Sequence, residues 1–123
     1  MGCDIHASIE AQKYEDLDWW GEVENIQIDR WYELFARLAG VRQSVPEFEV
    51  ISEPKGFPNN ASYETTDFYE RWGPDAHTPS YLTFYEIKKL PEKFHNELFY
   101  KVMQILAEKY GEHSVRVIFW FDN

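Results

Sequence analysis

The chain has 123 residues, with 12 Lys and Arg against 22 Asp and Glu, which gives a formal net charge of −10. Apolar residues make up 44% of the chain, and 9 Phe, 8 Tyr and 5 Trp supply large side chains for burial, which excludes wholesale disorder. The length suits one domain over residues 1–123, and no apolar stretch approaches the roughly 20 residues that a membrane span needs. We therefore expect a soluble, cytoplasmic protein with no membrane partner.

Acidic residues concentrate in two segments, 1–29 and 43–75, and the first holds eight acids against Lys13 alone. A protein that neutralises phosphates needs a basic stripe uninterrupted by like charge, so we expect no direct nucleic-acid binding. The acidic excess leaves three alternatives open. It is a solvated face, a cation site, or a surface that mimics nucleic acid toward a basic partner.

The N-terminal segment 3–12 alternates strictly between aliphatic and polar residues, which is typical of a strand with its aliphatic side on the core. Cys3 then faces the core, and burial without a basic neighbour leaves its thiol unreactive. As the single cysteine, it also excludes an internal disulfide framework. Segment 19–28 predicts a second strand, with a bulge where the apolar parity slips between Val23 and Ile26.

Two helices are predicted in the middle of the chain, separated by a long loop at 41–60 that is rich in Pro and Gly. Asp29 predicts the cap of the first helix, which ends at Gly40. The second helix begins near Ser62 and ends at Gly73. Its aromatic residues predicted to point inward are Tyr63, Tyr69 and Trp72.

The C-terminal part predicts two more helices and a strand. Thr78 followed by proline indicates a helix start, with the helix running through Lys89, and a longer helix is expected over 91–110. Its predicted core stripe is Phe94, Leu98, Val102, Ile105 and Leu106. Segment 114–121 is apolar on both faces and predicts a central or covered strand. The whole pattern indicates an α+β fold, with a small, mostly antiparallel sheet of about three strands against several helices.

Two Asp-x-His units carry the strongest chemical signal: Asp4 with His6 on the first strand, and Asp75 with His77 in a later loop. Residues i and i+2 of a strand point the same way, so Asp4 and His6 can converge on one ligand. Asp122 ends the last strand and joins the first pair if the two strands are neighbours. Carboxylate oxygen and imidazole nitrogen together suit a divalent cation such as Zn²⁺, Mn²⁺ or Mg²⁺.

These units predict a metal set of Asp4, His6 and Asp122, and catalytic roles for His6, His77 and Asp75. In a hydrolase the metal lowers the pKa of bound water, and a histidine acts as a ligand or general base. The alternative remains that a strand-edge Asp or His is only a hydrogen-bonding cap, and that His77 holds its own loop closed.

Ligand binding beyond this cluster is assigned to Arg42, Arg116 and Trp120. Arg116 shares a strand face with Trp120 by alternation, and an Arg beside aromatic rings suits a phosphorylated or nucleotide-like molecule whose base stacks on a ring. A structural pair between such an Arg and a carboxylate is the competing interpretation.

The two ends of the chain read GCDIH and FWFDN, and between them stand LAGVR, DAH and PSYLT. Together these strings resemble a family of small, functionally uncharacterised proteins encoded by bacteriophages and by bacterial prophage DNA. The resemblance spans nearly the whole chain and implies a phage-type accessory protein that works inside a bacterial host cell. It implies no particular activity.

Two hypotheses from different classes follow. In the first, the Asp and His residues form a polar pocket for a small phosphorylated or nucleotide-like ligand, with metal-dependent, phosphoesterase-like hydrolysis as its enzymatic form. In the second, the acidic segments and exposed aromatic residues form a protein-interaction module that inhibits a basic host protein, such as a defence or nucleic-acid-binding protein.

Overall fold

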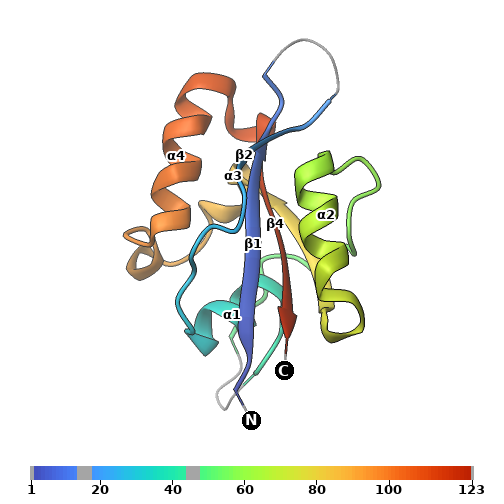
Figure 1. The fold of residues 1–123 in the computed structure, drawn as a ribbon. Coiled ribbons are helices and arrows are strands. Elements are labelled where there is room, and N and C mark those ends of the chain that lie inside the picture. The colour runs from blue at the N-terminus through green and yellow to red at the C-terminus, as the bar shows by residue number, and fades with distance from the viewer. Residues whose placement is uncertain (1, 14–17, 44–47, 123) are drawn as a thin grey trace.

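The fold is α+β and rests on a four-stranded antiparallel sheet (Figure 1). The computed structural model describes residues 2–13, 18–43 and 48–122. Across the sheet the strands are β2 (Trp20–Val23), β1 (Asp4–Ala11), β4 (Val115–Asp122) and β3 (His77–Thr83). The expected fold class is confirmed, with one strand more than the three that the sequence indicates.

The helices cover both faces of this sheet (Figure 1). They are α1 (Tyr32–Ala39), α2 (Tyr63–Trp72), α3 (Phe84–Ile87) and α4 (Leu98–Tyr110), and short 3-10 turns occupy Gly73–Asp75, Glu92–Phe94 and Glu112–Ser114. Helices α1, α3 and α4 pack on one face, and α2 lies on the other. None of the helices in the described residues is long and apolar enough to cross a membrane.

The strict alternation of β1 and β4 divides the sheet into an apolar face and a mixed face. On the apolar face, residues such as Ala7 and Phe119 are fully buried in the main core against α1, α3 and α4. The α2 face carries a smaller cluster around Phe68, Ile118 and Trp120, together with the polar residues of both strands. As predicted from its apolar pattern, β4 is central, since it pairs with β1 on one side and β3 on the other.

Strand β3 forms where the Thr78-Pro79 pair predicts a helix, so that prediction is wrong. Thr78 has φ 51°, and the pairing of β3 with β4 is irregular between His77 and Ser80. A proline lacks an N–H donor, and it is tolerated here because β3 is an edge strand with a bulge. The helix begins instead after Thr83, whose hydroxyl accepts from the Glu86 amide in a capping box.

Helix α4 differs from its prediction in extent and in part of its facing, since the predicted core residues Phe94, Val102 and Leu106 do contact the core. It begins at Leu98 rather than after Pro91, and Leu98 and Ile105 of the predicted stripe are 57% and 67% exposed. The helix buries a set of side chains about one position away: Phe99, Tyr100, Met103 and Ala107. Apolar residues lie at helical spacing on more than one side of this helix, so packing against the sheet selects the buried side.

Helices α1 and α2 end close to where the sequence places them. Gly40 ends α1 with φ 71°, and Ser62 caps α2 by accepting from the amide of Thr65. Two details differ, because Asp29 does not cap α1, which begins after Trp31, and because Tyr63 of α2 is 83% exposed.

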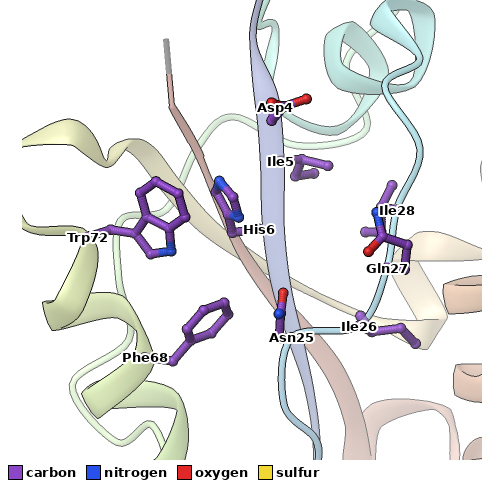
Figure 2. A pocket seen from close by; sticks show the side chains of 9 residues that line it. All are labelled: Asp4, Ile5, His6, Asn25, Ile26, Gln27, Ile28, Phe68 and Trp72. Atoms are coloured by element: carbon purple, nitrogen blue, oxygen red, sulfur yellow. The ribbon is translucent and has the colours of Figure 1, made fainter.

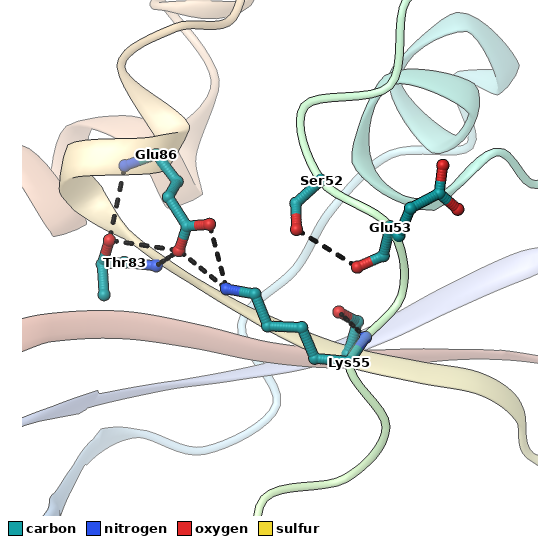
Figure 3. A network of polar contacts seen from close by, with 6 residues as sticks. Ser52, Glu53, Lys55, Thr83 and Glu86 are labelled. Atoms are coloured by element: carbon teal, nitrogen blue, oxygen red, sulfur yellow. Dashed lines mark hydrogen bonds and ion pairs between the residues drawn. The ribbon is translucent and has the colours of Figure 1, made fainter.

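Residues 48–60 of the long loop follow the free edge of β3 from one face of the sheet to the other. The Ile51 amide donates to the carbonyl of Arg37 in α1, and the Gly56 amide donates to Pro79 on β3. Between them, Lys55 donates to both carboxylate oxygens of Glu86 at 2.9 Å (Figure 3). The loop thereby covers the edge of β3, which otherwise exposes unpaired backbone groups.

Candidate functional site

A polar cleft of about 360 Å³ opens beside the first half of β1. One wall is the end of α2, with Phe68 and Trp72, and the other is the chain at 25–28, which runs along β1 after β2 has ended (Figure 2). This chain leaves the sheet register because Asn25 adopts φ 56°, although the Ile26 amide still donates to Ala7 of β1. The cleft therefore lies beside β1, between this chain and the end of α2.

His6 and Asp122 form a hydrogen-bonded pair at this cleft. The register of β1 with β4 sets Asp4 opposite Asp122 and His6 opposite Trp120 on the α2 face of the sheet, so the condition under which Asp122 joins the first pair is met. His6 Nε2 lies 2.5 Å from Asp122 Oδ2. With the carboxylate accepting from Nε2–H, Nδ1 of a neutral ring is the unprotonated nitrogen.

Trp72 stacks on the imidazole of His6, with the two ring centroids 3.9 Å apart and the planes inclined by 30°. In Figure 2 the rings of His6 and Trp72 face each other, with Phe68 beside them. Nδ1 of His6 has no hydrogen-bond partner among the described residues and is not buried. The pair thus presents an oriented imidazole that can accept a proton or a hydrogen bond from a ligand.

Asp4 lines the cleft but is engaged by Arg30, which donates to both carboxylate oxygens at 2.9 and 3.0 Å. These hydrogen bonds hold the pKa of the Asp4 carboxyl below its ordinary value. Among the described residues, no three His, Cys, Asp or Glu side chains stand close enough to hold a metal ion, so Asp4, His6 and Asp122 do not form a ready metal site in this arrangement.

The second Asp-x-His unit lies apart from the first. His77 pairs with Phe121, whose ring belongs to the main core, so His77 is on the apolar face and His6 is on the α2 face. Nδ1 of His77 lies 2.9 Å from the Thr78 hydroxyl, and Asp75 is exposed in the preceding turn. The structure does not bring His77 and Asp75 to the cleft.

Arg116 is held in a buried ion pair with Glu10, its cross-strand neighbour. Its guanidinium donates to Glu10 Oε1 at 2.7 and 3.0 Å, and the two residues are 3% and 0% exposed. Burial lowers the pKa of Arg116, while Glu10 opposes that shift. The other carboxylate oxygen of Glu10 accepts from the Ser62 amide, so the pair fastens the start of α2 to the sheet.

The other two predicted ligand-binding residues also lie outside the cleft lining. Trp120 is fully buried against Phe68 beneath α2. Arg42 lies against the ring of Tyr32, 5.4 Å from its centroid, near Cys3. Cys3 is fully buried, as its position in the alternation predicts, and burial raises the pKa of its thiol against the opposing effect of Arg42.

The sequence interpretation missed the contributions of Trp72, Phe68, Asn25 and Gln27 to the cleft. Two signals were present. Trp72 is predicted to point inward from its helix, and the parity slip after Val23 marks the point where the chain leaves the sheet and opens the cleft. Neither signal shows that the two segments lie on opposite sides of His6.

The chain was compared with protein-family models, with curated proteins and with solved structures. No family model matches the chain, and neither the curated proteins nor the solved structures contain a match.

Proposed function

We propose that the protein binds a small nucleotide-like molecule, with its base in the cleft beside His6. The observation that carries this proposal is the arrangement of His6, oriented by Asp122 and stacked against Trp72, on the wall of an open cleft. Planar bases stack on aromatic rings, and their edges form hydrogen bonds. We also propose that the protein works inside a bacterial cell, because the ends of the chain resemble those of phage proteins.

The side chains around the cleft match the two requirements of a base. Trp72 and Phe68 provide aromatic surface, and Asn25 and Gln27 carry amides with both donors and acceptors. His6 Nδ1 adds an acceptor for an N–H or O–H of the ligand. A binding site of this composition combines apolar contact with a few oriented polar groups, as small-molecule sites do.

Charge determines which part of a nucleotide enters. Asp4, which lines the cleft, and Asp122, which is hydrogen-bonded to the lining residue His6, disfavour a phosphate within the cleft. Arg30, fixed at the rim by Asp4, keeps further N–H donors for a phosphate that remains outside. We therefore assign the phosphate-binding role to Arg30, because it is hydrogen-bonded to the cleft residue Asp4 and is exposed, whereas Arg116 is buried in its ion pair with Glu10.

Calorimetric titration with adenosine, guanosine, cytidine and uridine 5′-monophosphates tests the proposal. We expect saturable binding of at least one of them, weakened at least tenfold in both His6→Gln and Trp72→Ala. His113→Gln is the matched control, since His113 also stacks on an aromatic ring but lies beside Tyr85, away from the cleft. Absence of binding by all four, or unchanged binding in both cleft variants, would overturn the proposal.

Metal-dependent hydrolysis is the enzymatic form of this proposal. It requires Asp4 to turn from Arg30 toward His6 and Asp122 so that three ligands converge. Thermal melting in EDTA, Zn²⁺, Mn²⁺ and Mg²⁺ tests this, because a metal that binds the native state raises Tm. A metal-dependent rise that is lost in His6→Gln and increased in Arg30→Gln would support the enzyme, and Tm values equal in all four solutions would leave a metal-independent binder.

A further inference from the structure

We infer that a second site, the groove between β2 and the start of α2, docks an extended basic peptide of another protein through its Arg side chains. The groove has a volume of about 460 Å³ and shares no residue with the cleft beside His6. Its aromatic lining comes from Trp19, Trp20 and Tyr63, and its acidic rim comes from Asp18 and Glu64. The inference is independent of the proposed nucleotide site.

The aromatic residues of this groove are unusually accessible for their size. Trp20 is 46% exposed and Tyr63 is 83% exposed. Trp19 already carries one guanidinium, since Arg116 Cζ lies 4.0 Å from the centroid of its ring. The fold thus places a buried Arg, which does not itself line the groove, on the face of one of the groove's Trp residues, and the exposed parts of Trp20 and Tyr63 offer the same interaction to a cation from outside.

The charge of the groove complements such a cation. Neither Asp18 nor Glu64 has an ion-pair partner within the part of the chain that the structure describes. A smaller hollow of about 170 Å³ continues from the groove past Gly21 and Glu64 and adds the carboxylates of Glu22 and Glu24, which are paired with Lys13 and Arg71. Because Glu22 and Glu24 are already paired, Asp18 and Glu64 are the carboxylates that would pair with an incoming cation.

The geometry favours an extended occupant. Strand β2 is an edge strand of the sheet, and the groove follows it. Strand and helix approach closely, since a Cβ added to Gly21 would lie 3.4 Å from both Glu64 Oε2 and Ser62 Oγ. A peptide lying along β2 sets alternate side chains on the groove side, so basic residues at every second position fit it best.

Fluorescence anisotropy with a short labelled peptide of alternating arginine and serine tests the inference. We expect salt-sensitive binding, and at least tenfold weaker binding when citrulline, which is neutral and nearly isosteric, replaces each arginine. Trp20→Leu and Tyr63→Leu keep apolar surface but remove the ring, and each should weaken binding about two- to fivefold. Tyr85→Leu is the control, because Tyr85 is also exposed but lies beside Lys88 and Lys89.

A charge-matched pair separates the groove from the overall acidity of the protein. Glu64→Gln and Glu108→Gln each remove one exposed carboxylate, but only Glu64 lines the groove. We expect weaker binding in the first variant alone. Equal losses in the two, equal binding of the citrulline peptide, or no binding of the arginine peptide would each overturn the inference. So would self-association that Trp20→Leu abolishes, because the occupant would then be a second copy of the chain.

Discussion

The two faces of the sheet are stabilised in different ways. On the face covered by α1, α3 and α4, the side chains of both central strands belong to one large apolar cluster. On the α2 face, the apolar cluster is small and two polar pairs flank it: His6 with Asp122 at one end, and Glu10 with Arg116 toward the other. Apolar packing is tolerant of composition, whereas buried polar pairs depend on each partner, so the face that carries the candidate site is the more sensitive one to substitution.

Breaking the buried ion pair should have the largest effect. Glu10→Ala leaves Arg116 charged and 3% exposed without its carboxylate, which we expect to reduce the free energy of unfolding by about 3–5 kcal/mol. Urea denaturation followed by far-UV circular dichroism measures this loss. The double variant Glu10→Met with Arg116→Met should recover most of it, because no charge then remains buried. A double variant as unstable as the single one would contradict this account.

Helix α4 tests the apolar face, and it offers an internal control. Met103 is fully buried and Ile105 is 67% exposed, two positions apart on the same helix. We expect Met103→Ala to cost about 2–5 kcal/mol, because it leaves a cavity in the main core. Ile105→Ala should change stability by less than about 0.5 kcal/mol. The same urea denaturation measures both, and a cost for Ile105→Ala as large as or larger than that for Met103→Ala would contradict the observed facing of α4.

Glu86 connects the loop to the edge of β3, and its effect should be smaller and dependent on pH (Figure 3). Burial alone would raise the pKa of Glu86, but hydrogen bonds from Lys55 and Thr83 outweigh it, and the pKa lies below the ordinary value of 4.5. A depressed folded-state pKa contributes stability that is present above the unfolded value and is lost as pH falls through the folded value.

Glu86→Gln should therefore destabilise the protein by about 1–2 kcal/mol at pH 7 through its cap and ion pair. The difference from wild type should shrink as the pH falls below 4.5, where the wild-type carboxyl takes up its proton. Urea denaturation at a series of pH values measures this difference. A constant difference down to the folded-state pKa would show that the charge of Glu86 plays no part.

Local patterns predicted the parts of the site that depend on one segment at a time. Alternation in β1 assigned Asp4 and His6 to one face. The apolar character of both faces of β4 indicated a central strand, and Asp122 is the last residue of that strand. The pairing of His6 with Asp122 also needed β1 and β4 to be neighbours, which the sequence left as a condition and the structure supplies. The stacking of Trp72 on His6 did not, since it joins α2 to β1 across most of the chain.

The missed strand β3 shows why local signals can conflict. Thr78-Pro79 has the composition of a helix start, while Thr83 and Glu86 form an equally good capping box five positions later. Local chemistry permits a helix to start at either position. The later start is selected because residues 77–83 then form β3, which satisfies the backbone groups of β4 on the side away from β1. The burial of Arg116 beside Glu10 is another such case, since cross-strand register and not residue type paired them.

The sequence by itself determined the α+β class, the presence of a strand at each end of the chain, the glycines that end α1 and α2, and the shared strand face of Asp4 and His6. These features depend on side-chain periodicity and on capping residues, which act over a few positions. Only the tertiary structure decided that β3 is a strand, which side of α4 is buried, and that Trp72 and the chain at 25–28 enclose His6 in a cleft. Those features arise because distant segments must satisfy one another's hydrogen bonds and fill one core, and no local pattern encodes which segments will meet.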